Sequence, residues 1–268
     1  RRDIKMSSRM VKEYVSSLVN KGIRDDGRKL LEYRKPLTVE YGISPKSAEG
    51  SARAKIGDTE VVAGVKMEVM EPFPDTPDEG NLMVNVELIP LSNPEFESGP
   101  PGIDAIELSR VVDRAIRESK GVDMKKLCVK KGEKVWTIVI DIYPINDAGN
   151  LFDACALAAL AAIKDARFPG YNEKEDNVDY TKKTEKKLPI IELPASVTVF
   201  KIKNNFIIDP NYDEVKVYDS RLTVATLKDG TICALQKGGD ATLSMEDVEK
   251  MIDLGIEKGK ELRKVLEK

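Results

Sequence analysis

The sequence of 268 residues contains no histidine. This absence excludes catalytic triads and dyads that use imidazole, zinc sites with histidine ligands, and proton transfer by an imidazole group. Acid–base chemistry in this chain would have to use carboxylates, lysine, tyrosine or a metal-bound water. The chain is long enough to bury a substantial core, either as one large domain or as two compact halves.

Cysteine, aromatic residues and long apolar runs are also scarce. The three cysteines, Cys128, Cys155 and Cys233, each lie in an apolar run, so we expect reduced, buried thiols. Aromatic residues make up 6% of the chain and are scattered, which argues against a platform for stacking nucleic-acid bases. No run approaches the roughly 18 apolar residues of a membrane span, and the first residues do not resemble a signal peptide. We therefore expect a cytoplasmic protein without membrane contact.

Charge, in contrast, is abundant and of both signs. Charged residues make up 33% of the chain, with 43 Lys and Arg against 46 Asp and Glu, and the formal net charge is −3. The surface must therefore carry both signs densely. The net acidity argues against strong nucleic-acid binding by the isolated chain.

Hydrophobic periodicity predicts an α+β fold with two similar halves. Helices are predicted at 4–20 (amphipathic), 103–119, 151–166 (almost wholly apolar, hence buried) and 243–268, the last with Ser244 as its N-cap. Strands are predicted at 37–41, 50–56, 59–68, 81–90, 127–128, 136–143, 196–200, 205–208, 221–227 and 231–236. We divide the chain into an N-terminal helix (1–22), a first βα half (23–169), a charged linker without periodicity (170–190) and a second half (191–268).

Four segments, in a fixed order, resemble a known family. They are Gly22-Ile23-Arg24-Asp25-Asp26-Gly27-Arg28 with Tyr33-Arg34-Lys35-Pro36-Leu37, then Glu107 to Arg114, Asp147 to Leu160, and Val197 through Gly239. Their order and spacing resemble the RNase PH family of phosphate-dependent 3′-to-5′ exoribonucleases and, within it, the non-catalytic RNase PH-like subunits of the archaeal exosome. The resemblance implies the RNase PH fold, in which two pseudo-symmetric βα halves with mixed sheets pack around central helices.

Two departures from the active members of this family decide the expected function. Active relatives hold phosphate with Gly-Thr/Ser-Arg before the buried helix, whereas the matching residues here are Gly149-Asn150-Leu151, and leucine has no guanidinium. They also carry two aspartates six positions apart that place a metal ion or assist proton transfer; here Asp209 fills the first position and Val215 the second. We therefore predict no catalytic residue, no metal ligand and no cofactor in this chain, with phosphate and any magnesium belonging to a partner's active site.

Three carboxylates near the second departure allow another interpretation. Asp209, Asp213 and Glu214 lie within six residues and could be regarded as a metal site. We prefer the simpler interpretation that Asp209-Pro210 opens a turn and that Glu214 is a solvated surface residue.

Arg110, Arg114 and Arg117 form a stripe at spacing i, i+4, i+7, which places them on one face of the helix at 103–119. The opposite face would be buried through Leu108, Val111, Val112, Ala115 and Ile116. Alone, such a stripe is equally a solvated face with salt bridges to Glu107 and Asp113. The resemblance implies that this helix borders the RNA path beside a partner's active site. We therefore predict that the three arginines bind RNA phosphates without sequence preference.

The expected function is that of a non-catalytic component of an RNA exosome ring. The resemblance implies pairing with a catalytic RNase PH-like subunit, whose active site this chain would complete, in a hexameric trimer of heterodimers. RNA-binding cap proteins would deliver single-stranded RNA to that ring for phosphorolytic 3′-to-5′ degradation. Two alternatives stay open: an active phosphate-dependent 3′-to-5′ exoribonuclease or tRNA-processing homo-oligomer, and an interaction scaffold with no RNA role at all.

Overall fold

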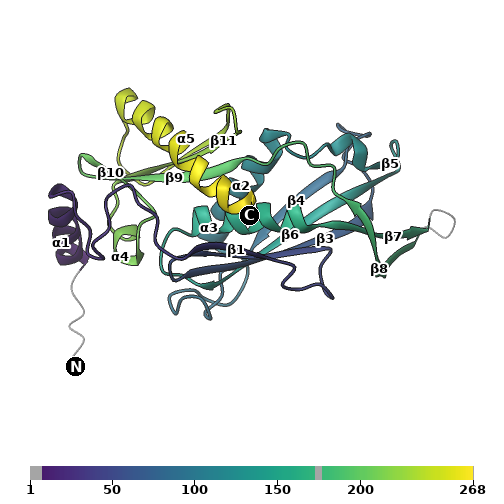
Figure 1. Ribbon diagram of the computed structural model, residues 1–268, viewed down its shortest axis with the longest axis horizontal. Coiled ribbons are helices and arrows are strands. Elements are labelled where there is room, and N and C mark those ends of the chain that lie inside the picture. The colour runs from purple at the N-terminus through teal and green to yellow at the C-terminus, as the bar shows by residue number, and fades with distance from the viewer. Residues whose placement is uncertain (1–7, 173–176, 268) are drawn as a thin grey trace.

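A computed structural model describes residues 8–172 and 177–267 (Figure 1). The helices are α1 (Ser8–Asn20), α2 (Ile103–Ser119), α3 (Leu151–Asp165), α4 (Tyr212–Val215) and α5 (Met245–Glu267), with a short 3-10 helix at Met124–Leu127. The strands are β1 (Leu37–Tyr41), β2 (Gly50–Ile56), β3 (Thr59–Met70), β4 (Asn81–Val86), β5 (Cys128–Lys130), β6 (Lys134–Asn146), β7 (Arg167–Asn172), β8 (Asn177–Lys187), β9 (Ala195–Ile202), β10 (Asn205–Ile208), β11 (Ser220–Thr226) and β12 (Ile232–Gly238). The predicted α+β class is confirmed.

The first half is built on a mixed sheet with strand order β1-β2-β3-β6-β4, and β5 pairs with β6. All its pairs are antiparallel except β4 with β6. Strand β3 alternates buried and half-buried residues over most of its length, because one face of the sheet meets the core. The strand predicted at 81–90 ends at Val86, where its parallel pairing with β6 stops opposite Ile142.

Helix α3 lies at the centre of the molecule, between the first sheet and the second half (Figure 1). Its residues from Asp153 to Ile163 are all buried, as its apolar composition predicts. The many alanines let the helix approach the sheet closely, and no Cβ would fit at Gly50 beside the carbonyl of Ala162.

The second half is a four-stranded antiparallel sheet with order β10-β9-β11-β12. Helix α5 covers β9 and β11. It begins with the predicted N-cap: Asp247 N–H donates to Ser244 Oγ at 3.1 Å, and Ser244 N–H donates to Asp247 Oδ2 at 3.1 Å. Helix α2 packs on β4 of the first half and on β11 and β12 of the second, so it joins the two sheets.

The amphipathic helix predicted at 4–20 is confirmed over its described part, as α1. Its residues Val15 and Val19 pack against Phe200 and Ile202 in a small separate core. Residues 1–7 of the predicted N-terminal segment, and Lys268 at the end of the closing helix, lie outside the described residues.

The charged segment between the halves has more regular structure than its sequence predicts. Strands β7 and β8 form a two-stranded hairpin, most of whose β8 residues are exposed (Figure 1). A strand that is exposed on both faces lacks alternation of apolar and polar residues, so periodicity could not reveal it. Residues 173–176 lie outside the described part of the chain.

The three cysteines are free, but only one fits the prediction fully. Cys155 is buried in α3, whereas Cys128 and Cys233 are half-buried, because they lie on strands at the margins of their sheets. The prediction of buried thiols is therefore wrong for these two.

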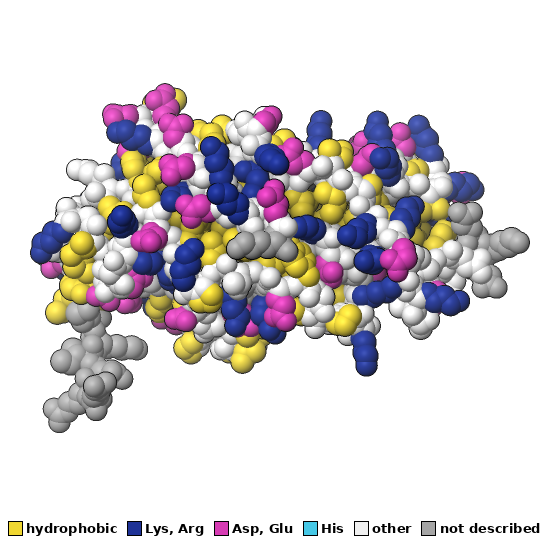
Figure 2. Space-filling model, in the orientation of Figure 1, with side chains coloured by type: hydrophobic (Ala, Val, Ile, Leu, Met, Phe, Trp, Pro, Cys, Tyr) yellow, Lys and Arg dark blue, Asp and Glu magenta, His cyan; other side chains and the backbone are white. Residues whose placement is uncertain are grey.

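The surface carries both signs of charge, as predicted: Lys and Arg side chains are interspersed with Asp and Glu over the face shown in Figure 2. Within the described residues, no helix is long and apolar enough to cross a membrane.

Candidate functional site

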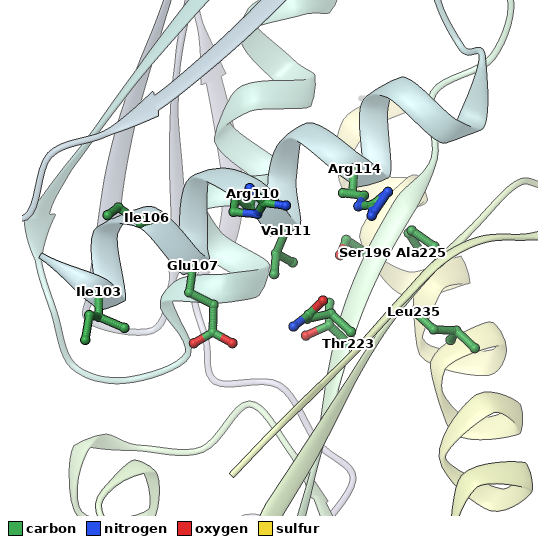
Figure 3. Close-up of a pocket in the computed structure, with 12 residues that line it drawn as sticks. Ile103, Ile106, Glu107, Arg110, Val111, Arg114, Ser196, Thr223, Ala225 and Leu235 are labelled. Atoms are coloured by element: carbon green, nitrogen blue, oxygen red, sulfur yellow. The ribbon is translucent and has the colours of Figure 1, made fainter. Parts of the chain in front are cut away.

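The arginine stripe lies on the exposed face of α2, and the opposite face is buried as predicted. Arg110 and Arg114 line a groove of about 470 Å³ between α2 and the strands β9, β11 and β12. Figure 3 shows them one turn apart on the helix, across the groove from Ser196, Thr223 and Leu235. The groove thus combines two cations, one carboxylate (Glu107, paired with Arg221), small hydroxyl side chains and an apolar wall.

The three arginines differ in how strongly they are held. Arg117 donates to Asp113 at 2.7 and 3.0 Å and to the carbonyl of Leu82 at 3.0 Å. Its hydrogen bond with Asp113 raises the pKa of Arg117. Arg114 Nη1 lies 3.4 Å from Glu118 Oε1, a distance at the long end for a hydrogen bond. Arg110 makes no salt bridge with any described residue, so Arg110 and Arg114 are the most available for a ligand.

All three arginines also line a depression of about 320 Å³ beside α2, together with the carboxylates Asp113 and Glu118. The structure therefore brings the predicted RNA ligands together on one surface. Sequence reasoning did not reveal the far wall of the groove, because Ser196, Thr223 and Leu235 come from strands that follow α2 by more than 75 residues. No local pattern marks such a juxtaposition.

A second pocket, of about 230 Å³, lies at the N-terminus of α3. Leu151 and Val215, the two departures from the active pattern, both line it. Its charged residues are the carboxylates Asp104, Glu107 and Asp147 and one cation, Arg221.

Arg221 is already engaged by other groups. Its Nη2 lies 2.6 Å from Glu107 Oε1, and its guanidinium lies 4.0 Å from the ring centroid of Phe152. Carboxylates therefore outnumber cations in the pocket, which disfavours a phosphate dianion at this helix N-terminus despite the helix dipole.

Asp209, at the first of the two expected carboxylate positions, is fully buried. Arg34 Nη2 lies 2.8 Å from its Oδ1, Arg28 Nη1 lies 3.1 Å from its Oδ2, and Asn150 Nδ2 donates to Oδ1 at 3.0 Å. The main-chain N–H of Arg34 donates to Oδ2 at 2.7 Å. Both carboxylate oxygens are therefore occupied, and a metal ion could bind here only by displacing an arginine.

Glu214 corrects an expectation. It is buried rather than solvated, and it forms an ion pair with Arg24, whose Nε donates to Glu214 Oε1 at 2.9 Å. Arg24 also donates to the carbonyls of Ile208 and Asp209, at 2.8 Å each. The preference for a surface residue was wrong because the partner is 190 residues away in sequence.

The short helix α4 explains how Glu214 reaches its partner. Asn211 caps α4, accepting from Glu214 N–H at 3.0 Å, while Glu214 Oε2 accepts from Asn211 N–H at 2.8 Å. This cap orients Glu214 inward and leaves Asp213 exposed. Within the described residues, no three Asp, Glu or Cys side chains are placed to hold a metal ion.

Asp153, in the first turn of α3, is a further buried carboxyl that sequence reasoning missed. It accepts hydrogen bonds from Thr198 N–H at 2.7 Å, Tyr33 Oη at 3.2 Å and Asn150 Nδ2 at 3.2 Å. Burial, which outweighs these bonds, raises the pKa of Asp153 to about 7. Asp153 therefore connects the central helix to β9 and to the segment before β1.

Comparison with known proteins identifies the family. The model of the 3′ exoribonuclease family, domain 1, matches residues 33–169, and that of domain 2 matches residues 192–258. The chain therefore belongs to the RNase PH family of 3′ exoribonucleases.

Its relatives include exosome components. The Exosome complex component Rrp42 of Methanocella arvoryzae is 46% identical over 256 residues, which cover 96% of this chain and 95% of that protein. Among solved structures, a chain of the Archaeoglobus fulgidus exosome with RNA bound to the active site is 42% identical and superposes with a TM-score of 0.87, covering 96% of this chain and 98% of that chain. A chain of an archaeal exosome core is 39% identical, with a TM-score of 0.85 and coverage of 97% and 98%. The predicted RNase PH fold is thus confirmed.

Proposed function

We propose that this chain is a non-catalytic subunit of a cytoplasmic exosome ring, and that it guides single-stranded RNA to the active site of a catalytic RNase PH-like partner. Its close relatives are named exosome components, and they match it over nearly their whole length. Three copies of the heterodimer would form the hexameric ring, and RNA-binding cap proteins would feed it. Phosphate, and any metal ion, would act in the partner.

The absence of autonomous catalysis is supported by the pocket at the N-terminus of α3. Leu151 and Val215 line this pocket where the family pattern calls for a cation and a carboxylate. Three carboxylates face a single arginine that is already paired. Because phosphorolysis requires bound phosphate, this charge arrangement opposes the reaction.

Arg110 and Arg114 carry the proposal for RNA. They are exposed, lie one turn apart, and line one groove. Guanidinium groups bind phosphates in a bidentate manner, so two of them at this spacing suit a phosphate backbone without selecting a base.

Large exposed apolar side chains at the same groove support an assembly. Ile103, Ile106 and Leu235 are 85%, 49% and 45% exposed, and Ile103 and Leu235 lie on opposite sides of the groove (Figure 3). Large exposed apolar side chains with charged residues near them are typical of a protein interface. We propose that the partner covers these apolar side chains while leaving the arginines beside the RNA.

The test is RNA degradation by the assembled complex carrying Arg110→Gln and Arg114→Gln. We expect the rate to fall about tenfold at subsaturating RNA, since two phosphate contacts are lost, while the mass of the complex stays unchanged. The matched control is Lys260→Gln with Lys264→Gln on the exposed side of α5, which removes the same charge and should leave the rate unchanged.

Two results would contradict the proposal. An unchanged rate in an intact double-arginine variant would refute the RNA-guiding role and favour a scaffold. Release of nucleoside diphosphates by the purified chain alone, with phosphate and RNA, would show that it is itself an active exoribonuclease.

A further inference from the structure

A second positively charged groove lies along α1. Helix α1 is at one end of the molecule (Figure 1). It is open and has a volume of about 630 Å³. Four cations line it, Arg9, Lys12, Lys21 and Lys203, together with one carboxylate, Glu13, and three uncharged polar residues of α1. Positive charge is thus concentrated here on a chain whose net charge is negative.

Only part of this charge is neutralised by neighbours. Arg9 Nε lies 3.0 Å from Glu13 Oε1, and Lys12 Nζ lies 3.0 Å from Asp219 Oδ1. Asp219 also accepts the main-chain N–H of Lys203 at 2.7 Å. Lys21 and Lys203 are exposed, and their ammonium groups make no salt bridge within the described residues. The groove therefore has an excess of two positive charges.

The uncharged lining adds hydrogen-bonding capacity. Ser16 is only 8% exposed, and its hydroxyl has no hydrogen-bond partner among the described residues. Ser17 and Asn20 lie on the same side of α1 and also line the groove. A hydroxyl group without a partner among the described residues, in a groove with an excess of positive charge, suits a phosphate oxygen, which accepts hydrogen bonds but does not donate them.

The lining also distinguishes between kinds of ligand. Among the residues that the structure describes, no apolar side chain lines the groove, because Val15 and Val19 of α1 face the small core instead. A protein interface needs an apolar centre, and a membrane-binding helix needs apolar side chains to insert into lipid. A polyanion needs neither, since its affinity comes from neutralised phosphates.

We propose that the α1 groove binds the sugar–phosphate backbone of single-stranded RNA, as a contact separate from the arginines of α2. The choice of RNA as the polyanion rests on the proposed function, whereas the site rests on the excess positive charge of the groove and on the hydroxyl group of Ser16. Binding through phosphates alone is independent of base sequence.

The experiment measures binding of fluorescein-labelled oligo(A) and oligo(U), 20 nucleotides each, to the purified full chain by anisotropy across a salt series. The variant carries Lys21→Gln and Lys203→Gln, which removes the two charges that make no salt bridge. We expect about fivefold weaker binding of both RNAs at low salt. The slope of the logarithm of the binding constant against the logarithm of the salt concentration should become shallower by about 1.4, because each of the two lost phosphate contacts contributes about 0.7 on a single strand.

The variant with Lys260→Gln and Lys264→Gln is the control for net charge, and it should retain the wild-type affinity and slope. The proposal is overturned if the Lys21 and Lys203 variant binds like the control, if only one of the two RNAs is affected, or if the wild-type chain binds neither RNA at low salt. These outcomes are independent of the degradation rate of the assembled complex, so they separate the α1 groove from the role of α2. Thermal melting of each variant verifies that the fold is intact.

Discussion

The buried ion pair between Arg24 and Glu214 offers the sharpest test of how the chain is held together. The side chain of Arg24 is 0% exposed and that of Glu214 is 3% exposed. The pair joins the segment after α1 to the second half of the chain. Substituting Glu214→Gln preserves the shape of the side chain but leaves the guanidinium of Arg24 buried without an opposite charge.

Removing one partner of a buried ion pair costs about 3–5 kcal/mol. Three contacts reduce the loss: Arg24 keeps its bonds to the carbonyls of Ile208 and Asp209, and the glutamine oxygen can still accept one hydrogen bond. The weakened cap of α4 adds a loss of up to about 1 kcal/mol. We therefore expect Glu214→Gln to lower the free energy of unfolding by about 3 kcal/mol, and Tm by roughly 6–12 °C.

Guanidinium chloride unfolding followed by circular dichroism measures this change. Asp213→Asn, next to Glu214 in α4 but exposed, is the matched control and should shift the free energy of unfolding by less than about 0.5 kcal/mol. The double variant Arg24→Met with Glu214→Met should recover part of the loss, because it leaves no unpaired charge. A loss below about 1 kcal/mol for Glu214→Gln, or one equal to that of the control, would refute the reasoning.

Two further predictions concern the region around α3. Because burial raises the pKa of Asp153 to about 7 in the folded chain, from an ordinary value of 3.8, its contribution to stability is present at acidic pH and is lost as pH rises through 7. Asp153→Asn should therefore reduce the drop in unfolding free energy between pH 5 and 8 by about 2–3 kcal/mol, and an identical pH profile would contradict this. Gly149 has φ +102°, and a Cβ there would lie 2.5 Å from the carbonyl oxygen of Pro210, so Gly149→Ala should cost about 2–3 kcal/mol on chemical denaturation. Gly64→Ala, whose Cβ would meet Ala48 at 3.7 Å, is the control and should cost little.

The elements of the fold could largely be predicted because their signals are local. The spacing of apolar residues fixed α2 at 103–119, and the alanine-rich composition marked α3 as buried. The cap at Ser244 was visible as a pattern three residues long. The β7–β8 hairpin had no such signal, because β8 exposes most of its residues and a strand without a buried face shows no alternation.

The candidate site was predictable only where its residues lie on one element. The arginine stripe follows from helical geometry, since Arg110, Arg114 and Arg117 share a single helix face. The burial of Glu214 depends on Arg24, which is 190 residues away in sequence. The buried position of Asp153 depends on β9 and on the segment before β1. Contacts between distant segments leave no periodic pattern in the sequence, so neither the burial of Glu214 nor that of Asp153 could be predicted from it.

The residues of the first family motif and the residues that bear on catalysis lie in different parts of the structure. Arg24, Arg28 and Arg34 belong to the first motif of the resemblance, and the structure uses all three to bind the second half of the chain, at Glu214 and Asp209. These arginines serve the fold, because Arg24 neutralises the buried Glu214, and Arg28 and Arg34 together neutralise the buried Asp209. Such a motif can persist whether or not the chain has an active site. The proposed absence of catalysis rests instead on the pocket at the N-terminus of α3, where Leu151 and Val215 lie beside three carboxylates and one paired arginine.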